Sequence, residues 1–156
     1  MTNIIIRGPL GIGKTTVAKD LAKKINARYI SIDKILEKER LDKVDKKLGK
    51  IPLKNFISVN KIISKIKNKR LVVDGNCYYK EQIDDLIKRL KNCNVFTLKA
   101  SVNVCISRNN GRKKVYSEGA TRAVHNLVSC FDYGVSINTE NKTKDEVVEE
   151  ILKKLG

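Results

Sequence analysis

Residues 8–16 of the chain are Gly8-Pro9-Leu10-Gly11-Ile12-Gly13-Lys14-Thr15-Thr16, a glycine-rich segment that ends in a lysine and two threonines. The residues just before it, 3–7, are mostly β-branched and apolar, which is typical of a strand buried on both faces. The residues just after it place Val17, Leu21 and Ile25 on one face of a helix. A glycine-rich turn from a buried strand into a helix is the setting of a phosphate-binding loop.

The spacing of this loop is complete, with Gly8, four further residues, and then Gly13, Lys14 and Thr15. Glycines let successive backbone N–H groups turn inward around an anion, and the following helix adds the positive end of its dipole. In such loops the lysine reaches the β- and γ-phosphates and the threonine hydroxyl ligates Mg²⁺. We therefore expect ATP and Mg²⁺ as cofactors, with these nucleotide-binding residues: Gly8, Gly11, Ile12, Gly13, Lys14, Thr15 and Thr16.

The length and composition predict one domain over residues 1–156. No apolar run approaches the ~20 residues of a membrane span, and the first strand follows Met1 too closely for a signal peptide. We therefore expect a cytoplasmic protein without a membrane partner. The four cysteines, Cys77, Cys93, Cys105 and Cys130, have no paired metal spacing and are predicted to be free thiols.

The net charge of +16 has two interpretations. A basic protein can bind nucleic acid through phosphate contacts, and it can also carry a lysine-rich solvated surface. Aromatic residues are few and tryptophan is absent, so a base-stacking surface has little support. A nucleic-acid partner stays an alternative, and a small-molecule partner is favoured.

A carboxylate follows the second predicted strand. Residues 28–32 form this strand, and Asp33 comes directly after it, before a helix expected at 34–40. Ligands of open α/β sheets bind at the carboxyl ends of the strands, which favours Asp33 as a site residue. Asp33 is also a common type of helix cap, and both roles remain open.

A second carboxylate ends the third predicted strand, where Leu71-Val72-Val73 runs into Asp74. An apolar strand that ends in aspartate has the form of a Walker B strand. Its carboxylate holds Mg²⁺ directly or through water, beside the threonine of the phosphate-binding loop. Thr15 and Asp74 are therefore the predicted metal-binding residues.

The remaining residues continue the alternation of strands and helices. Helices are expected at 55–67, 81–91, 102–108, 117–131 and 143–155, and strands at 94–98 and 133–137, with 41–53 outside the sheet. This alternation predicts an α/β fold with a parallel sheet and helices on both faces. We expect five strands in the order 2-3-1-4-5, the order seen in P-loop kinases.

Over nearly its whole length the chain resembles small P-loop kinases of the nucleoside-monophosphate-kinase-like group. It is most similar to the chloramphenicol phosphotransferase branch and more distantly similar to shikimate and gluconate kinases. The resemblance rests on Ser31-Ile32-Asp33, on Arg108 and Arg112, and on residues 122–125, 131–134 and 138–139. The chain departs from that branch at Asn138, where an aspartate is usual.

The resemblance implies an ATP-dependent phosphotransferase that moves the γ-phosphate to a hydroxyl or phosphate of a small molecule. Lys14 would neutralise the phosphates, Asp33 would activate the acceptor, and Arg108 and Arg112 would act from a lid near 108–118. The alternative interpretation is that the two arginines belong to a solvated basic turn.

Two alternative functions remain open. One is a nucleotide or nucleic-acid-end kinase, and the other is a nucleotide-dependent switch or binding module. Near the predicted lid, Arg122 is a candidate phosphate contact, and His125 is expected to be a packed or capping residue.

Overall fold

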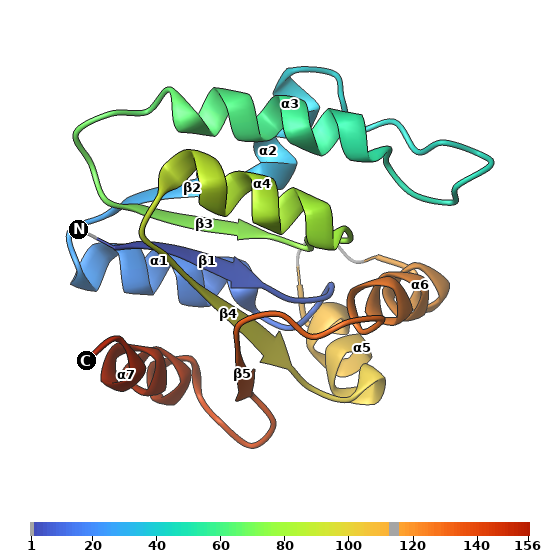
Figure 1. Cartoon of the computed structure of the whole chain (residues 1–156). Helices are drawn as coiled ribbons and strands as arrows, with labels where there is room; N and C mark the ends of the chain where they lie inside the picture. Colours follow the sequence, from blue (N-terminus) through green and yellow to red (C-terminus); the bar gives the residue numbers. More distant parts are fainter. Residues whose placement is uncertain (1, 113–115) are drawn as a thin grey trace.

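The computed structural model describes residues 2–112 and 116–156. Its centre is a five-stranded parallel sheet in the order β2-β3-β1-β4-β5, which confirms the predicted order (Figure 1). The strands are β1 (Asn3–Arg7), β2 (Arg28–Ser31), β3 (Leu71–Gly75), β4 (Cys93–Lys99) and β5 (Val135–Asn138).

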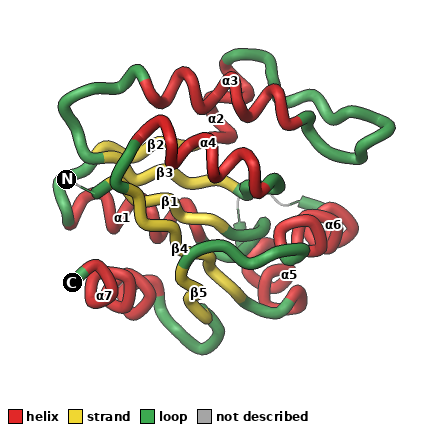
Figure 2. Tube along the Cα trace, viewed as in Figure 1, coloured by secondary structure: helices red, strands yellow, loops and turns green. Residues whose placement is uncertain are grey.

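Helices cover both faces of the sheet (Figure 2). They are α1 (Lys14–Lys24), α2 (Ile32–Lys38), α3 (Leu53–Ser64), α4 (Lys80–Leu90), α5 (Val102–Asn110), α6 (Glu118–Val128) and α7 (Lys144–Leu155). Helices α1 and α7 pack on one face of the sheet, and α2, α3 and α4 pack on the other. In the described part of the chain, no helix is long and apolar enough to cross a membrane.

The central strand β1 explains why both faces are covered. Ile4 and Ile6 belong to the core on the α1 side, Ile5 belongs to the opposite core, and all three are fully buried. A strand with apolar side chains on both faces is stable only between two layers of helices. The loop that follows β1 is thereby held at the carboxyl edge of the sheet.

The start of α2 differs from the prediction in a way that matters for the site. The helix begins at Ile32 rather than at residue 34, because the Ser31 hydroxyl accepts a hydrogen bond from the Lys34 N–H and acts as the cap. The interpretation of Asp33 as the cap is therefore wrong. Asp33 lies in the first turn of α2 and its carboxylate is exposed.

Other boundaries shift by a few residues. Helix α6 ends at Val128 rather than at 131. The segment predicted to lie outside the sheet, 41–53, ends one residue earlier because Leu53 begins α3, and it contains one isolated bridge between Asp45 and Lys50. The four cysteines are free thiols, as expected.

Arg7, the last residue of β1, fixes the point where the glycine-rich loop leaves the sheet. Its guanidinium is fully buried and donates hydrogen bonds to three backbone carbonyls, at Cys77 (3.2 Å), Phe131 (3.2 Å) and Val128 (2.5 Å). It also stacks on the Phe131 ring, 4.2 Å from the ring centre. Burial lowers the pKa of Arg7, and the three carbonyls offset part of the cost of placing this cation in the core.

Candidate active site

The glycine-rich loop has the backbone geometry that an anion site requires. Gly13 has a φ of 91° and is the residue before α1, and no side chain caps the helix there. Gly11 has a φ of 78°, and a Cβ at this position would lie 2.2 Å from the Cys105 carbonyl oxygen. The first N–H groups of α1 therefore have no side-chain partner, so they can receive phosphate oxygens.

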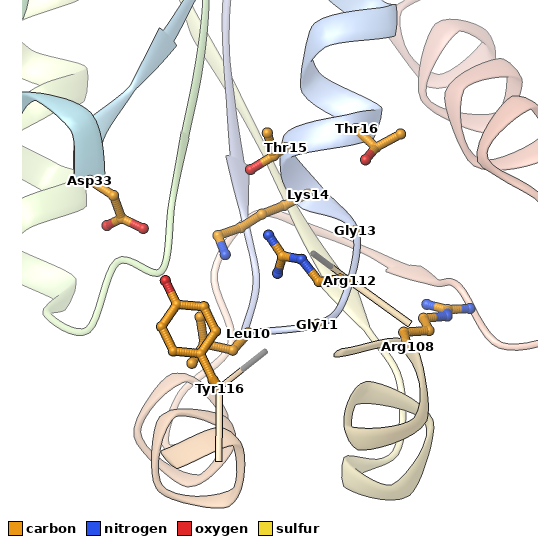
Figure 3. Close-up of a pocket in the computed structure, with 10 residues that line it drawn as sticks. All are labelled: Leu10, Gly11, Gly13, Lys14, Thr15, Thr16, Asp33, Arg108, Arg112 and Tyr116. Carbon is orange, nitrogen blue, oxygen red and sulfur yellow. The ribbon is translucent and has the colours of Figure 1, made fainter. Parts of the chain in front are cut away.

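A cavity of about 280 Å³ lies in front of this loop. Its lining residues are Leu10, Gly11, Gly13, Lys14, Thr15, Thr16, Asp33, Arg108, Arg112 and Tyr116. In Figure 3 the Lys14 amine points into the space between Asp33, Tyr116 and Arg112. The fold thus brings all four predicted catalytic residues, Lys14, Asp33, Arg108 and Arg112, to the lining of one cavity.

Lys14 is held as a poorly hydrated cation. Only 7% of the residue is exposed, and its amine donates a long hydrogen bond of 3.5 Å to the Pro9 carbonyl. Burial lowers the pKa of Lys14, while the carboxylates of Asp33 and Asp74 act in the opposite direction. A cation in a site that excludes water attracts phosphate more strongly than one in solvent.

Asp74 lies at the carboxyl end of β3 and is 1% exposed. Its Oδ2 accepts a 2.6 Å hydrogen bond from the Tyr29 hydroxyl. Burial raises the pKa of Asp74, and Tyr29, Lys14 and Thr15 counteract this by favouring the carboxylate. The Thr15 hydroxyl is thus close to Asp74, as the predicted metal-binding pair requires.

This donor set fits Mg²⁺. A carboxylate and a hydroxyl are hard oxygen ligands, and Mg²⁺ in kinases is bound by one or two protein groups together with waters and phosphates. Within residues 2–112 and 116–156, no group of three acidic, histidine or cysteine side chains could hold a metal by itself. Thr15 and Asp74 therefore suit a metal ion that is also held by the bound nucleotide.

The two predicted lid arginines lie in different surroundings. Arg112 lies in the cavity, close enough to Lys14 that its charge helps to lower the pKa of that lysine. Arg108 donates to the Thr139 side chain (2.9 Å), the Thr139 carbonyl (2.8 Å) and the Ile12 carbonyl (3.3 Å). In Figure 3 its guanidinium points away from Lys14. The lid role of both residues stays a prediction, and 113–115 of the lid segment lie outside the described residues.

These positions predict separate effects for the two arginines. Arg112→Ala should lower kcat by roughly 10²–10³-fold and change ATP affinity much less, because a cation over the transferring phosphoryl group acts mainly in the transition state. Arg108→Ala should instead weaken ATP binding, because Arg108 supports the loop through the Ile12 carbonyl. Steady-state kinetics and calorimetry with ATP separate the two effects.

Arg122→Ala is the matched control, because Arg122 pairs with Glu118 on the exposed side of α6. A loss of ATP affinity with unchanged kcat in Arg112→Ala would show that this arginine contacts bound ATP equally well in the ground state and in the transition state.

Two tyrosines lie in this site although no sequence pattern identified them as site residues. Tyr116 lines the cavity, and Tyr29 binds Asp74. A lone tyrosine in an apolar strand or after a basic turn matches no motif, so only the fold reveals them. Of the weaker candidates, Arg122 pairs with Glu118, and the half-buried His125 places its Nε2 2.9 Å from the Ala100 carbonyl oxygen.

The phosphate-binding loop, the strand order and the buried carboxylate beside Thr15 define a P-loop kinase. The family described as shikimate kinase matches residues 10–156, and the chain belongs to this family. It is 28% identical to a shikimate kinase of Thermodesulfovibrio yellowstonii, over 98% of this chain and 94% of that protein. It is 26% identical to a putative adenylate kinase of Pyrococcus abyssi, over 96% and 81% of the two chains.

Solved structures agree with the fold. A gluconokinase from Sinorhizobium meliloti superposes with a TM-score of 0.76 over 99% of this chain and 91% of its own, at 14% identity. The chain is therefore an ATP-dependent phosphotransferase that acts on a small molecule. ATP is the phosphoryl donor, and it is used together with Mg²⁺.

Proposed function

We propose that this chain transfers the γ-phosphate of ATP to a hydroxyl group of shikimate or a closely related hydroxy acid, with Asp33 as the general base. The observation that carries the proposal is the position of Asp33 in the cavity, opposite the Lys14 amine (Figure 3). An acceptor between the two would have its hydroxyl beside a carboxylate and its incoming phosphate beside a cation.

In this proposal the glycine-rich loop, residues 8–16, binds the nucleotide. Residues 8–13 and the first turn of α1 hold the phosphates through backbone N–H groups, and Lys14 contacts the β- and γ-phosphates. Thr15 and Asp74 would hold Mg²⁺, which would supply positive charge against the phosphates.

The transfer step needs few further groups. The acceptor oxygen forms a bond to the γ-phosphorus, and the bond from that phosphorus to the β,γ-bridging oxygen breaks to release ADP. The acceptor proton passes to the Asp33 carboxylate. Lys14 and Arg112 stabilise the charge on the transferring group, and the described residues on either side of 113–115, 108–112 and 116–118, belong to the proposed lid of a single kinase domain.

The acceptor class rests on family membership and on the cavity. The Thermodesulfovibrio yellowstonii relative is named shikimate kinase. A cavity of about 280 Å³ in front of the loop suits the phosphoryl group together with a small ring compound. A nucleoside monophosphate is the second candidate acceptor, because the Pyrococcus abyssi relative is named a putative adenylate kinase.

The test is a transfer assay with purified protein, ATP and Mg²⁺, in which shikimate, gluconate and AMP are offered separately. ADP release measures the rate, and ³¹P NMR identifies the phosphorylated product. We expect a phosphate monoester of shikimate. Transfer to AMP alone would overturn the acceptor, and ADP release that no acceptor stimulates would overturn the proposed transfer.

A further inference from the structure

Tyr29 lies on the same face of the sheet as Asp74 of the predicted metal site. In the register of β2 and β3, Ser31 pairs with Asp74 and Tyr29 pairs with Val72. Residues two apart on a strand share a face, so Tyr29, Ser31 and Asp74 point to one side. That side is the one that α1 covers, because the Lys19 amine of α1 lies 5.5 Å from the centre of the Tyr29 ring.

The Tyr29 hydroxyl compensates for the burial of Asp74. The distance from Oη to Oδ2 is 2.6 Å, which is typical of a strong hydrogen bond to a carboxylate. In the part of the chain that the structure describes, no lysine or arginine lies within ion-pair distance of Asp74. The tyrosine therefore fixes one oxygen of the Asp74 carboxylate.

We propose that Tyr29 is the positioning residue of the magnesium site, which holds the Asp74 carboxylate in the orientation that binds the ion together with Thr15. This inference rests on the proposed function, since it takes Thr15 and Asp74 as the metal-binding pair. Partners that orient metal ligands typically contribute 10–100-fold to metal affinity, by order of magnitude.

The test measures binding of a fluorescent ATP analogue at increasing Mg²⁺ concentrations and, separately, in EDTA. Tyr29→Phe keeps the ring under Lys19 and removes only the hydroxyl. We expect the Mg²⁺ concentration at half-maximal effect to rise by about tenfold, with affinity in EDTA within about twofold of wild type. Asp74→Asn should remove most of the Mg²⁺ response.

The control is Tyr79→Phe, because the Tyr79 hydroxyl donates to the Ile51 carbonyl (2.8 Å) away from the cavity. Its Mg²⁺ dependence should match wild type. The double variant Tyr29→Phe/Asp74→Asn completes a cycle. If Tyr29 acts through Asp74, the double variant should respond to Mg²⁺ as Asp74→Asn does. Because Asp74→Asn also removes the buried charge, the double variant keeps the test open if Tyr29→Phe alone does not fold.

The outcomes separate this inference from the proposal on which it rests. A wild-type Mg²⁺ midpoint in Tyr29→Phe, with a lost response in Asp74→Asn, would overturn the role of Tyr29 and leave the metal site in place. Equal loss of affinity with and without Mg²⁺ would show that the hydroxyl only supports packing. An unchanged response in Asp74→Asn would overturn the metal-binding pair itself.

Discussion

Replacing Asp33 with asparagine is expected to lower phosphoryl transfer by roughly 10²–10⁴-fold, the usual contribution of a general base. The amide keeps the size of the side chain but cannot take the acceptor proton. ATP and Mg²⁺ binding should stay nearly unchanged, because the loop and Asp74 provide those contacts. The measurement is the transfer rate with the acceptor found in the assay above, together with calorimetry for ATP.

The fold of the Asp33→Asn variant is expected to survive, because Ser31 and not Asp33 caps α2. Asp145→Asn is the matched control, since Asp145 is also an exposed acidic residue in the first turn of a helix and does not line the cavity. Slow hydrolysis of ATP should persist in Asp33→Asn, because water needs no acceptor site. Equal transfer rates in wild type and Asp33→Asn would remove the general base from the mechanism and favour a nucleotide-binding module.

The parts of the site that the sequence predicted depend on local structure. Gly11 and Gly13 have positive φ angles, and a Cβ on Gly8 would lie 2.9 Å from Ile12 Cγ2, so the spacing of these glycines specifies the loop. Asp74 was predictable because a strand of fixed direction ends there, and the carboxyl ends of parallel strands meet at one edge. The strand order followed from the alternation of strands and helices and from the resemblance to P-loop kinases.

The parts that the sequence did not predict depend on contacts between distant segments. Tyr29 and Asp74 are 45 residues apart, and nothing in either strand pattern indicates that their side chains meet. Arg108 turns toward Thr139, 31 residues later, because the last strand ends there. The cap of α2 was ambiguous because Ser31 and Asp33 are both capping types, and only the backbone conformation selects the serine.

Replacing Lys14 with methionine is expected to remove most of the affinity for the ATP phosphates and to lower transfer by roughly 10²–10³-fold. Methionine keeps an unbranched apolar chain in the space that the lysine stem fills, so the change removes the charge with little loss of packing. The effect should be large because only 7% of Lys14 is exposed and its amine points into the cavity in front of the loop. Calorimetry with ATP and Mg²⁺ gives the affinity directly.

Lys23→Met is the matched control, because Lys23 is an exposed lysine in the last turn of the same helix. The control should bind ATP as wild type does, and thermal unfolding should show that both variants are folded. Burial already lowers the pKa of Lys14, so the native state gains little from carrying this charge, and Lys14→Met should not unfold the protein. Unchanged ATP affinity in folded Lys14→Met would contradict the assignment of residues 8–16 as the phosphate-binding loop. The proposed roles of Asp33, Arg112 and Tyr29 would then fail as well, because each of them depends on ATP phosphates bound at that loop.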